Sequence, residues 1–145
     1  PDACFVDLGA MGAGVFDRLR QLGFEKVFGV NFGAASIEDK KYANKRAEMW
    51  LSLRDWLKAG GCLPAGDIEL RDDLIGPEYG FDAQQRYQLE RKEDMKARGL
   101  ASPDAADAIA VTFAYPVAHR EARPIDNRPR VTYGAGTASS GWMGH

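Results

Sequence analysis

The sequence predicts an α/β domain, and three observations lead to this fold class. Near the N-terminus, two strand-like runs are separated by a glycine-rich turn and a stretch with helical periodicity. A long middle segment carries apolar residues at three- and four-residue steps, which is the spacing of one helix face. Further along, two short β-rich runs flank a turn-prone segment, which is typical of a hairpin. The expected domain therefore combines a strand–helix–strand unit, a long helix and a hairpin.

The N-terminal unit has the pattern of two strands joined by a helix. Its parts are a strand at 3–6, a glycine-rich turn at 9–14, a helix at 15–22 and a second strand at 26–32. The first strand is apolar, which predicts that it is fully buried, that it ends at Asp7, and that Cys4 is a buried thiol. Gly23 is a suitable end for the helix. Because a helical crossover joins the strands, we expect them to pair in parallel.

The long helix is predicted over residues 42–57, where the apolar stripe is most regular. Gly60 and Gly61 then end the pattern. Trp50 and Trp56 both lie on the stripe, so packing in the core explains them better than stacking on nucleic-acid bases. This helix is expected to cover a large apolar surface.

Shorter elements follow in the second half of the chain. They are a helical stretch at 71–74, hairpin strands at 79–81 and 86–90 around a turn at 82–85, a helix at 93–98, and a last helix at 102–114. Ser102 is expected to cap the last helix, with Pro103 at its first position and Asp104 in its first turn. Residues 117–145 lack sustained periodicity and predict a flexible tail.

Composition and motifs exclude several classes of function. A formal net charge of -2 excludes a broadly basic nucleic-acid coat, although a local basic strip could still bind phosphates. Cys4 and Cys62 lack the spacing of a zinc site. No run approaches the roughly 20 apolar residues of a membrane span. The phosphate-binding pattern GxxxxGK[ST] does not occur, so ATP hydrolysis is not expected.

Three acids are candidate metal ligands. Asp7 follows the first strand at its carboxyl end, where α/β sheets place ligand-facing groups, although capping the next helix would explain it equally well. Asp104 and Asp107 are three residues apart and share one helix face, and Asp104 could also serve as a first-turn acid. Carboxylate oxygens suit Mg²⁺, and two cations can bracket the reacting oxygens of a phosphodiester. The acids therefore favour a metal-dependent nuclease.

Four blocks of sequence carry a family resemblance. In order they are VDLGAMGAGVFDRL (6–19), YANKRAEMW (42–50), LERKEDMKARG (89–99) and SPDAADA (102–108). They resemble successive blocks of the C-terminal nuclease domain of phage terminase large subunits, and the last also resembles the acidic helix of RuvC-type resolvases. The resemblance implies a partial RNase H-like nuclease fold over residues 1–116. The first strand of that family, with its own catalytic acid, and the ATPase motor would precede residue 1.

The resemblance also implies an activity and partners. The family cleaves concatemeric double-stranded DNA during packaging in the bacterial host cytoplasm, with Mg²⁺ or Mn²⁺ held at a two-metal site by a triad of acids. Asp7 matches the acid of its strand, and Asp104 or Asp107 matches the acid of the last helix; the resemblance does not choose between them. The portal and the small terminase subunit are further implied partners. Without the first catalytic strand we expect at most weak cleavage, and an exposed sheet edge would invite self-association.

Basic residues lie next to the acidic helix in the sequence. Arg91, Lys92, Lys96 and Arg98 are candidates for holding the DNA backbone near the metals. Acidic residues interleave with them, so an ordinary solvated surface is the simpler explanation for most of them.

Two other functions fit parts of the sequence. A catalytically incomplete packaging protein could serve in docking. The segment at 6–14 also resembles the opening of an NAD(P)-binding unit, but its glycines follow GxxGxG rather than GxGxxG. Asp7 would, in addition, place a carboxylate where the pyrophosphate must approach. We therefore rank NAD(P) binding below docking.

Overall fold

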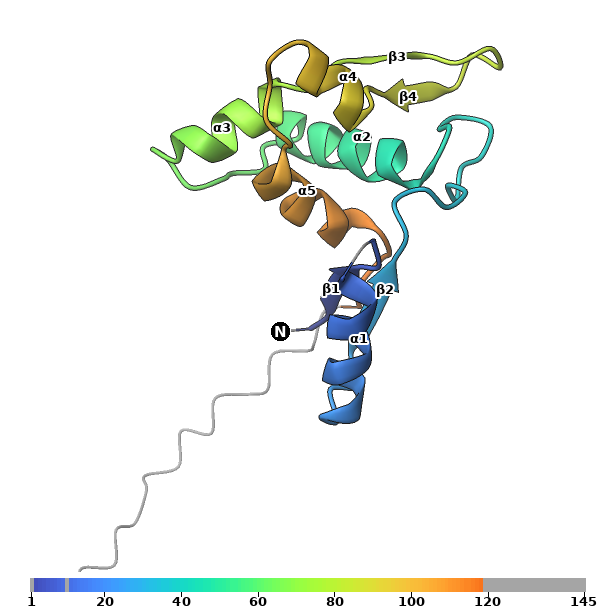
Figure 1. Ribbon diagram of the computed structural model, residues 1–145, viewed down its shortest axis with the longest axis vertical. Helices are drawn as coiled ribbons and strands as arrows, with labels where there is room; N and C mark the ends of the chain where they lie inside the picture. Colours follow the sequence, from blue (N-terminus) through green and yellow to red (C-terminus); the bar gives the residue numbers. More distant parts are fainter. Residues whose placement is uncertain (1, 10, 119–145) are drawn as a thin grey trace, which may run out of the picture.

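The computed structural model of the protein describes residues 2–9 and 11–118, which form two small sheets and a set of helices (Figure 1). The elements in order are β1 (Cys4–Asp7), α1 (Gly12–Gln21), β2 (Val27–Val30), α2 (Lys45–Lys58), α3 (Ile68–Ile75), β3 (Tyr79–Phe81), β4 (Tyr87–Leu89), α4 (Lys92–Ala97), α5 (Asp104–Ala110) and the 3-10 helix η1 (Val111–Phe113). The predicted α/β class is confirmed. Residues 119–145, which include most of the predicted tail, lie outside the described residues.

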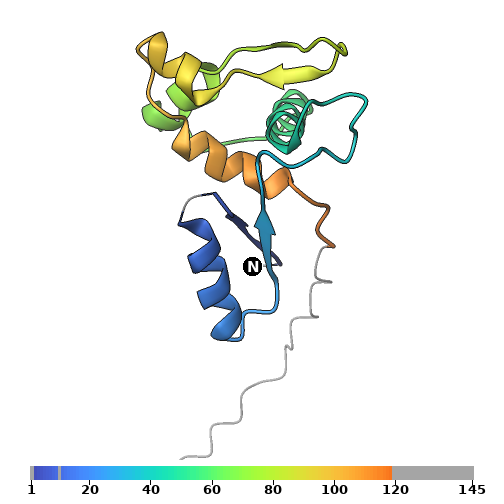
Figure 2. The same ribbon diagram turned by 45° about the vertical axis from the view of Figure 1, so that its right-hand side comes forward.

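The β1–α1–β2 unit forms the lower part of the molecule (Figures 1 and 2). β1 and β2 pair in parallel, from Cys4 opposite Val27 to Asp7 opposite Val30, as the helical crossover predicts. Gly12 allows the close packing of α1 on β1, because a Cβ atom there would lie 1.6 Å from the backbone oxygen of Asp7. Only glycine permits this start of α1.

Burial of β1 differs from the prediction. Cys4 and Asp7 are exposed and the residues between them are half-buried, so the predicted full burial of the strand and of the Cys4 thiol is wrong. The physical reason is that this sheet has two strands in the described part of the chain. α1 on one side and η1 on the other leave much of such a narrow sheet uncovered, and α1 itself has no buried residue.

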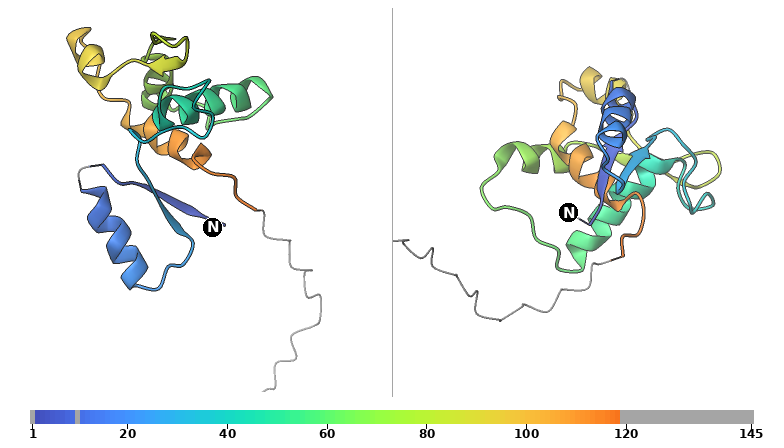
Figure 3. Two further views of the ribbon diagram at one scale, coloured as in Figure 1. Left: turned by 90° about the vertical axis from the view of Figure 1, so that its right-hand side faces the viewer. Right: turned by 90° about the horizontal axis from the view of Figure 1, so that it is seen from below.

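The core lies around α2, between α5 and α3 (Figure 3). Met49 and Leu53 of α2 are almost fully buried, and Ala106 of α5 packs with them. Trp50 joins this core, as predicted. Trp56 lies at its edge, with 39% of its surface exposed, and its ring packs on Phe113 at a centroid distance of 5.8 Å.

Side-chain caps set the beginnings of two helices. The Oδ1 atom of Asn44 accepts a hydrogen bond from the N–H of Ala47 (2.9 Å), so α2 begins at Lys45 rather than at residue 42. The Oδ1 atom of Asp67 accepts one from the N–H of Leu70 (3.0 Å). Because this cap fixes an earlier start, α3 is longer than the predicted stretch at 71–74.

The predicted hairpin is confirmed. β3 and β4 pair antiparallel, from Tyr79 opposite Leu89 to Phe81 opposite Tyr87. Asp82 fixes the turn, because its Oδ1 atom accepts hydrogen bonds from the N–H groups of Gln84 and Arg86 at 2.9 Å each. Within residues 2–9 and 11–118, every helix is too short or too polar to cross a bilayer.

Candidate metal centre

The helix that carries two of the candidate acids is capped from a neighbouring helix. Ser102 does not cap α5 as predicted, because its hydroxyl donates to the carboxylate of Asp104 (2.7 Å). The Oδ2 atom of Asp73 in α3 instead accepts hydrogen bonds from the N–H groups of Ala105 (2.9 Å) and Ala106 (3.4 Å). These are donors at a helix start that would otherwise lack a partner. Asp73 therefore fixes the start of the helix that presents Asp104 and Asp107.

Asp107 is buried in a ring of donors and cations. Only 7% of its surface is exposed. Its Oδ1 atom accepts a hydrogen bond from the indole N–H of Trp50 (2.7 Å) and a longer one from Nε of Arg46 (3.4 Å). The ammonium of Lys92 lies 2.8 Å from its Oδ2 atom. A buried carboxylate is stable only with such partners.

The Oδ2 atom of Asp107 is the unusual atom of this cluster. It is buried, and it accepts no hydrogen bond from the described residues. Its neighbour is the ammonium of Lys92 at 2.8 Å, so Oδ2 is paired with a cation although it receives neither of the N–H donors that hold Oδ1. A carboxylate oxygen that already faces a positive charge suits a hard metal ion that would displace the ammonium.

Asp104 differs from Asp107 in its exposure and in its hydrogen-bond partners. Its side chain is 81% exposed, and Lys92 lies 3.5 Å from its Oδ1 atom. The hydroxyl of Ser102, and then the charge of Lys92, hold the pKa of Asp104 below its usual value. Asp104 is therefore ionised at neutral pH. One ammonium, that of Lys92, lies beside both carboxylates of α5.

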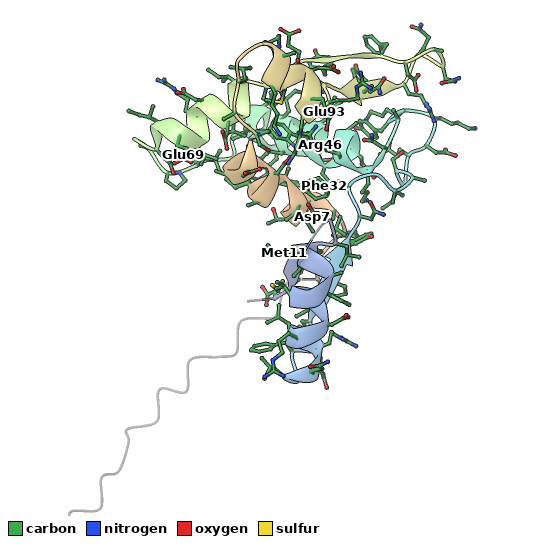
Figure 4. All side chains as sticks on the ribbon, viewed as in Figure 1. Asp7, Met11, Phe32, Arg46, Glu69 and Glu93 are labelled. Carbon is green, nitrogen blue, oxygen red and sulfur yellow. The ribbon has the colours of Figure 1, made fainter. Side chains whose placement is uncertain are left out.

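Asp7 lies at the carboxyl end of β1, the end that points toward α5 (Figures 3 and 4). Its Oδ1 atom accepts a hydrogen bond from the N–H of Gly9 (2.9 Å). No side chain caps α1, so Asp7 does not have the capping role that was its alternative. Among the described residues, no three Asp, Glu, His or Cys side chains form a group that could hold a metal. The structure thus does not gather Asp7, Asp104 and Asp107 into one ligand cluster.

Comparison with known proteins identifies the fold. No protein-family model matches the sequence, and none of the curated proteins is similar to it at the sequence level. Among solved structures, the chain is similar to the nuclease domain of the large terminase subunit gp2 of bacterial virus Sf6. The TM-score is 0.64 at 19% identity, over 81% of this chain and 66% of that one.

The chain has the fold of a terminase nuclease domain. A lysine-to-alanine variant of the Sf6 domain with manganese gives a TM-score of 0.67 at 19% identity, over 79% of this chain and 66% of that one. The same kind of variant with calcium gives 0.66, with equal identity and coverage. The chain spans about two thirds of the length of these domains. The predicted partial RNase H-like fold is thereby confirmed.

Within this terminase fold, most of the candidate DNA-binding residues are engaged with carboxylates. Arg91 pairs with Asp94 (2.9 Å), and Arg98 donates from Nε to Glu90 (2.8 Å). Lys92 lies between the two acids of α5. Lys96 forms no ion pair with any residue that the structure describes. Three of the four basic residues therefore form local ion pairs, and Lys96 forms none with the described residues.

Sequence reasoning missed three residues of the candidate site. The sequence predicts only core packing for Trp50 and no role for Arg46, yet both donate to Asp107. Neither contact had a local signal, because Asp107 lies 61 and 57 positions away in the chain. Asp73 had no local signal either, because it caps a helix that starts about thirty residues later in the chain.

Proposed function

We propose that this chain is part of the metal-dependent endonuclease of a phage DNA-packaging terminase and acts on double-stranded DNA. The observation that carries the proposal is the buried carboxylate of Asp107, whose Oδ2 atom faces a cation, the ammonium of Lys92, at 2.8 Å in a chain with a terminase nuclease fold. The presence of manganese or calcium in structures of the Sf6 domain supports divalent cations as the cofactor. Residues 1–116 are the proposed nuclease portion.

Three carboxylates are the proposed ligands. Asp107 would bind the divalent cation through Oδ2, while its Oδ1 atom keeps the hydrogen bonds from Trp50 and Arg46. Asp104 is exposed and can turn toward the same cation, whereas Asp7, which the structure does not gather with them, would have to approach from the end of β1 to complete the triad. Mg²⁺ or Mn²⁺ held there would supply Lewis acidity toward a phosphodiester. Lys92 offsets one of the two negative charges on α5 and so reduces the repulsion between this face of the protein and DNA.

The proposal is tested by plasmid nicking with the full chain. We expect slow nicking that requires Mn²⁺ or Mg²⁺, that stops with EDTA, and that is lost in D107N. E69Q is the matched control, because Glu69 is an exposed acid in the first turn of α3. Nicking that persists in D107N would contradict the assignment. Rapid cutting by the wild-type chain would contradict only the expectation of weak activity.

DNA binding by Arg91, Lys92, Lys96 and Arg98 is part of the same proposal. Neutralising Lys92 and Arg98 together should weaken binding equally for all DNA sequences, because phosphate contacts carry no sequence information. The slope of log K against log salt should flatten by about two, one per lost phosphate contact. The control is K58A, at the end of α2. An unchanged slope in the double variant would exclude these residues from the DNA interface.

Docking to other packaging proteins is a second candidate function. It is favoured by the β1–α1–β2 unit, in which Val15, Leu22 and Phe24 are each more than half exposed. Exposed apolar residues of this kind can mark a protein-binding surface, and the portal and the small terminase subunit are the proposed partners. L22E/F24E should abolish binding to such a partner and leave nicking unchanged. Binding that survives this variant would exclude the surface.

A further inference from the structure

The indole of Trp50 makes the shortest hydrogen bond to Asp107. The donor–acceptor distance is 2.7 Å, and both residues are buried, Trp50 at 6% and Asp107 at 7% exposure. Hydrogen bonds to an ionised acceptor are about twice as strong as neutral ones. This bond links the middle of α2 to the first turn of α5.

The donors around Asp107 are distributed unequally between its two oxygens. Oδ1 receives both N–H donors, from Trp50 and Arg46, whereas Oδ2 faces only the ammonium of Lys92 among the described residues, at 2.8 Å. A carboxylate whose one oxygen is tied down cannot rotate freely about its Cβ–Cγ bond. The direction of the Oδ2 lone pairs is therefore set by what holds Oδ1.

The indole is itself covered by a cation that has its own anchor. The guanidinium of Arg46 lies over its ring at 5.7 Å from the centroid, and Arg46 Nη1 donates to the backbone oxygen of Glu90 (2.8 Å). The hairpin thus braces Arg46 (labelled in Figure 4), and Arg46 braces Trp50. Such outer partners orient metal ligands and are needed for affinity.

We infer that Trp50 is a positioning residue of the proposed metal centre: its indole N–H fixes Oδ1 of Asp107 and thereby leaves Oδ2 directed at the cation. The inference rests on the proposed function. It assigns to a core tryptophan a role in metal affinity that packing alone would not produce. Trp56, on the same helix, makes no hydrogen bond to Asp107 and serves as the natural comparison.

The test is a Mn²⁺ titration of the full-length chain by calorimetry. Removing the N–H in W50F, or in the shape-preserving Trp50→benzothienylalanine variant, should raise the Kd for Mn²⁺ by about 10- to 100-fold. W56F should leave the Kd unchanged. The benzothienylalanine variant retains the volume of the ring, so a fall in affinity there reports the lost donor and not a cavity.

A second readout needs no metal. In the metal-free wild type, the indole ¹⁵N–¹H resonance of Trp50, assigned by its loss in W50F, should move in D107N because a neutral amide oxygen is a weaker acceptor. The inference is overturned if this resonance stays in place, or if the benzothienylalanine variant binds Mn²⁺ as tightly as the wild type. Absence of Mn²⁺ binding to the wild type would instead overturn the proposed function.

Discussion

Asp104 and Asp107 are three residues apart on α5, but their side chains lie in different environments. Both lie on one face of α5, yet Asp107 is buried among Trp50, Arg46 and Lys92, whereas Asp104 is exposed. The helix enters the core between them, so the second acid reaches the donors of α2 and the first does not. Asp107 is therefore the better candidate for the main ligand.

This contrast predicts unequal effects on stability. D107A should lower the free energy of unfolding by about 3–5 kcal/mol, because it leaves buried cationic and N–H groups without their partner. D104A, at the exposed position, should change it by less than about 0.5 kcal/mol. Urea denaturation measures both. Equal effects of the two variants would contradict the burial described for Asp107.

At the residue scale, sequence reasoning found the acids and Lys92 but not the contacts that connect them. The spacing of Asp104 and Asp107 follows from helix geometry, which is local and readable. The hydrogen bond from Trp50 joins residues 57 positions apart. No local pattern encodes a contact over such a separation, so Trp50 could be assigned only to the core.

At the scale of elements, α5 depends on α3 for its first turn. The Asp73 carboxylate caps α5 across the interface. Substituting an N-cap residue costs about 1 kcal/mol, so D73A should lose about that much stability, measured by urea denaturation. D72A is the matched control, because Asp72 pairs only with Arg71 on the surface and exposed pairs contribute little. A D73A variant as stable as D72A would show that the cap is not used.

The hairpin and α4 are joined by Arg98 and Glu90. The hydrogen bonds from the Arg98 guanidinium, and then that from the N–H of Glu78, hold the pKa of Glu90 below its ordinary value of 4.5. A lowered folded-state pKa adds stability above pH 4.5, and this stability is lost as the pH falls through the folded value.

R98M should therefore be less stable than the wild type at pH 6 to 7, and the difference should shrink as the pH falls below about 4.5. Unfolding free energies between pH 3 and 7 measure this, with K96M as the control that should keep the wild-type slope. A difference between wild type and R98M that does not vary with pH would contradict the pairing.

Most elements were predictable because their signals are local. Gly23 and Gly99, both with positive φ, end helices where expected, and the turn at 82–85 forms the hairpin. Two predictions failed for reasons of tertiary structure. The burial of β1 depends on how many strands its sheet has, and the cap of α5 comes from another helix.

At the scale of the whole molecule, the β1–α1–β2 unit projects from the layer of α2, α3 and the hairpin (Figure 2). No third strand pairs with this two-stranded sheet within residues 2–9 and 11–118, and open sheet edges favour pairing with another chain. We expect light scattering to give masses above the 15.9 kDa monomer as concentration rises.

V15K/L22K changes the outer face of α1 but leaves the strand edges intact, so this variant should still associate. A mass of 15.9 kDa at every concentration would contradict edge pairing. Loss of association in V15K/L22K would instead assign the contact to the apolar face of α1.

The central claim is that Asp107 presents a carboxylate oxygen for a divalent cation within a terminase nuclease fold. The structure of a crystal grown with Mn²⁺ tests this claim most directly. We predict anomalous density in direct contact with Oδ2 of Asp107, the ammonium of Lys92 displaced from its 2.8 Å position, and the Trp50 hydrogen bond to Oδ1 retained. Saturating Mn²⁺ with no density at Asp107, and with Lys92 still in place, would contradict the claim.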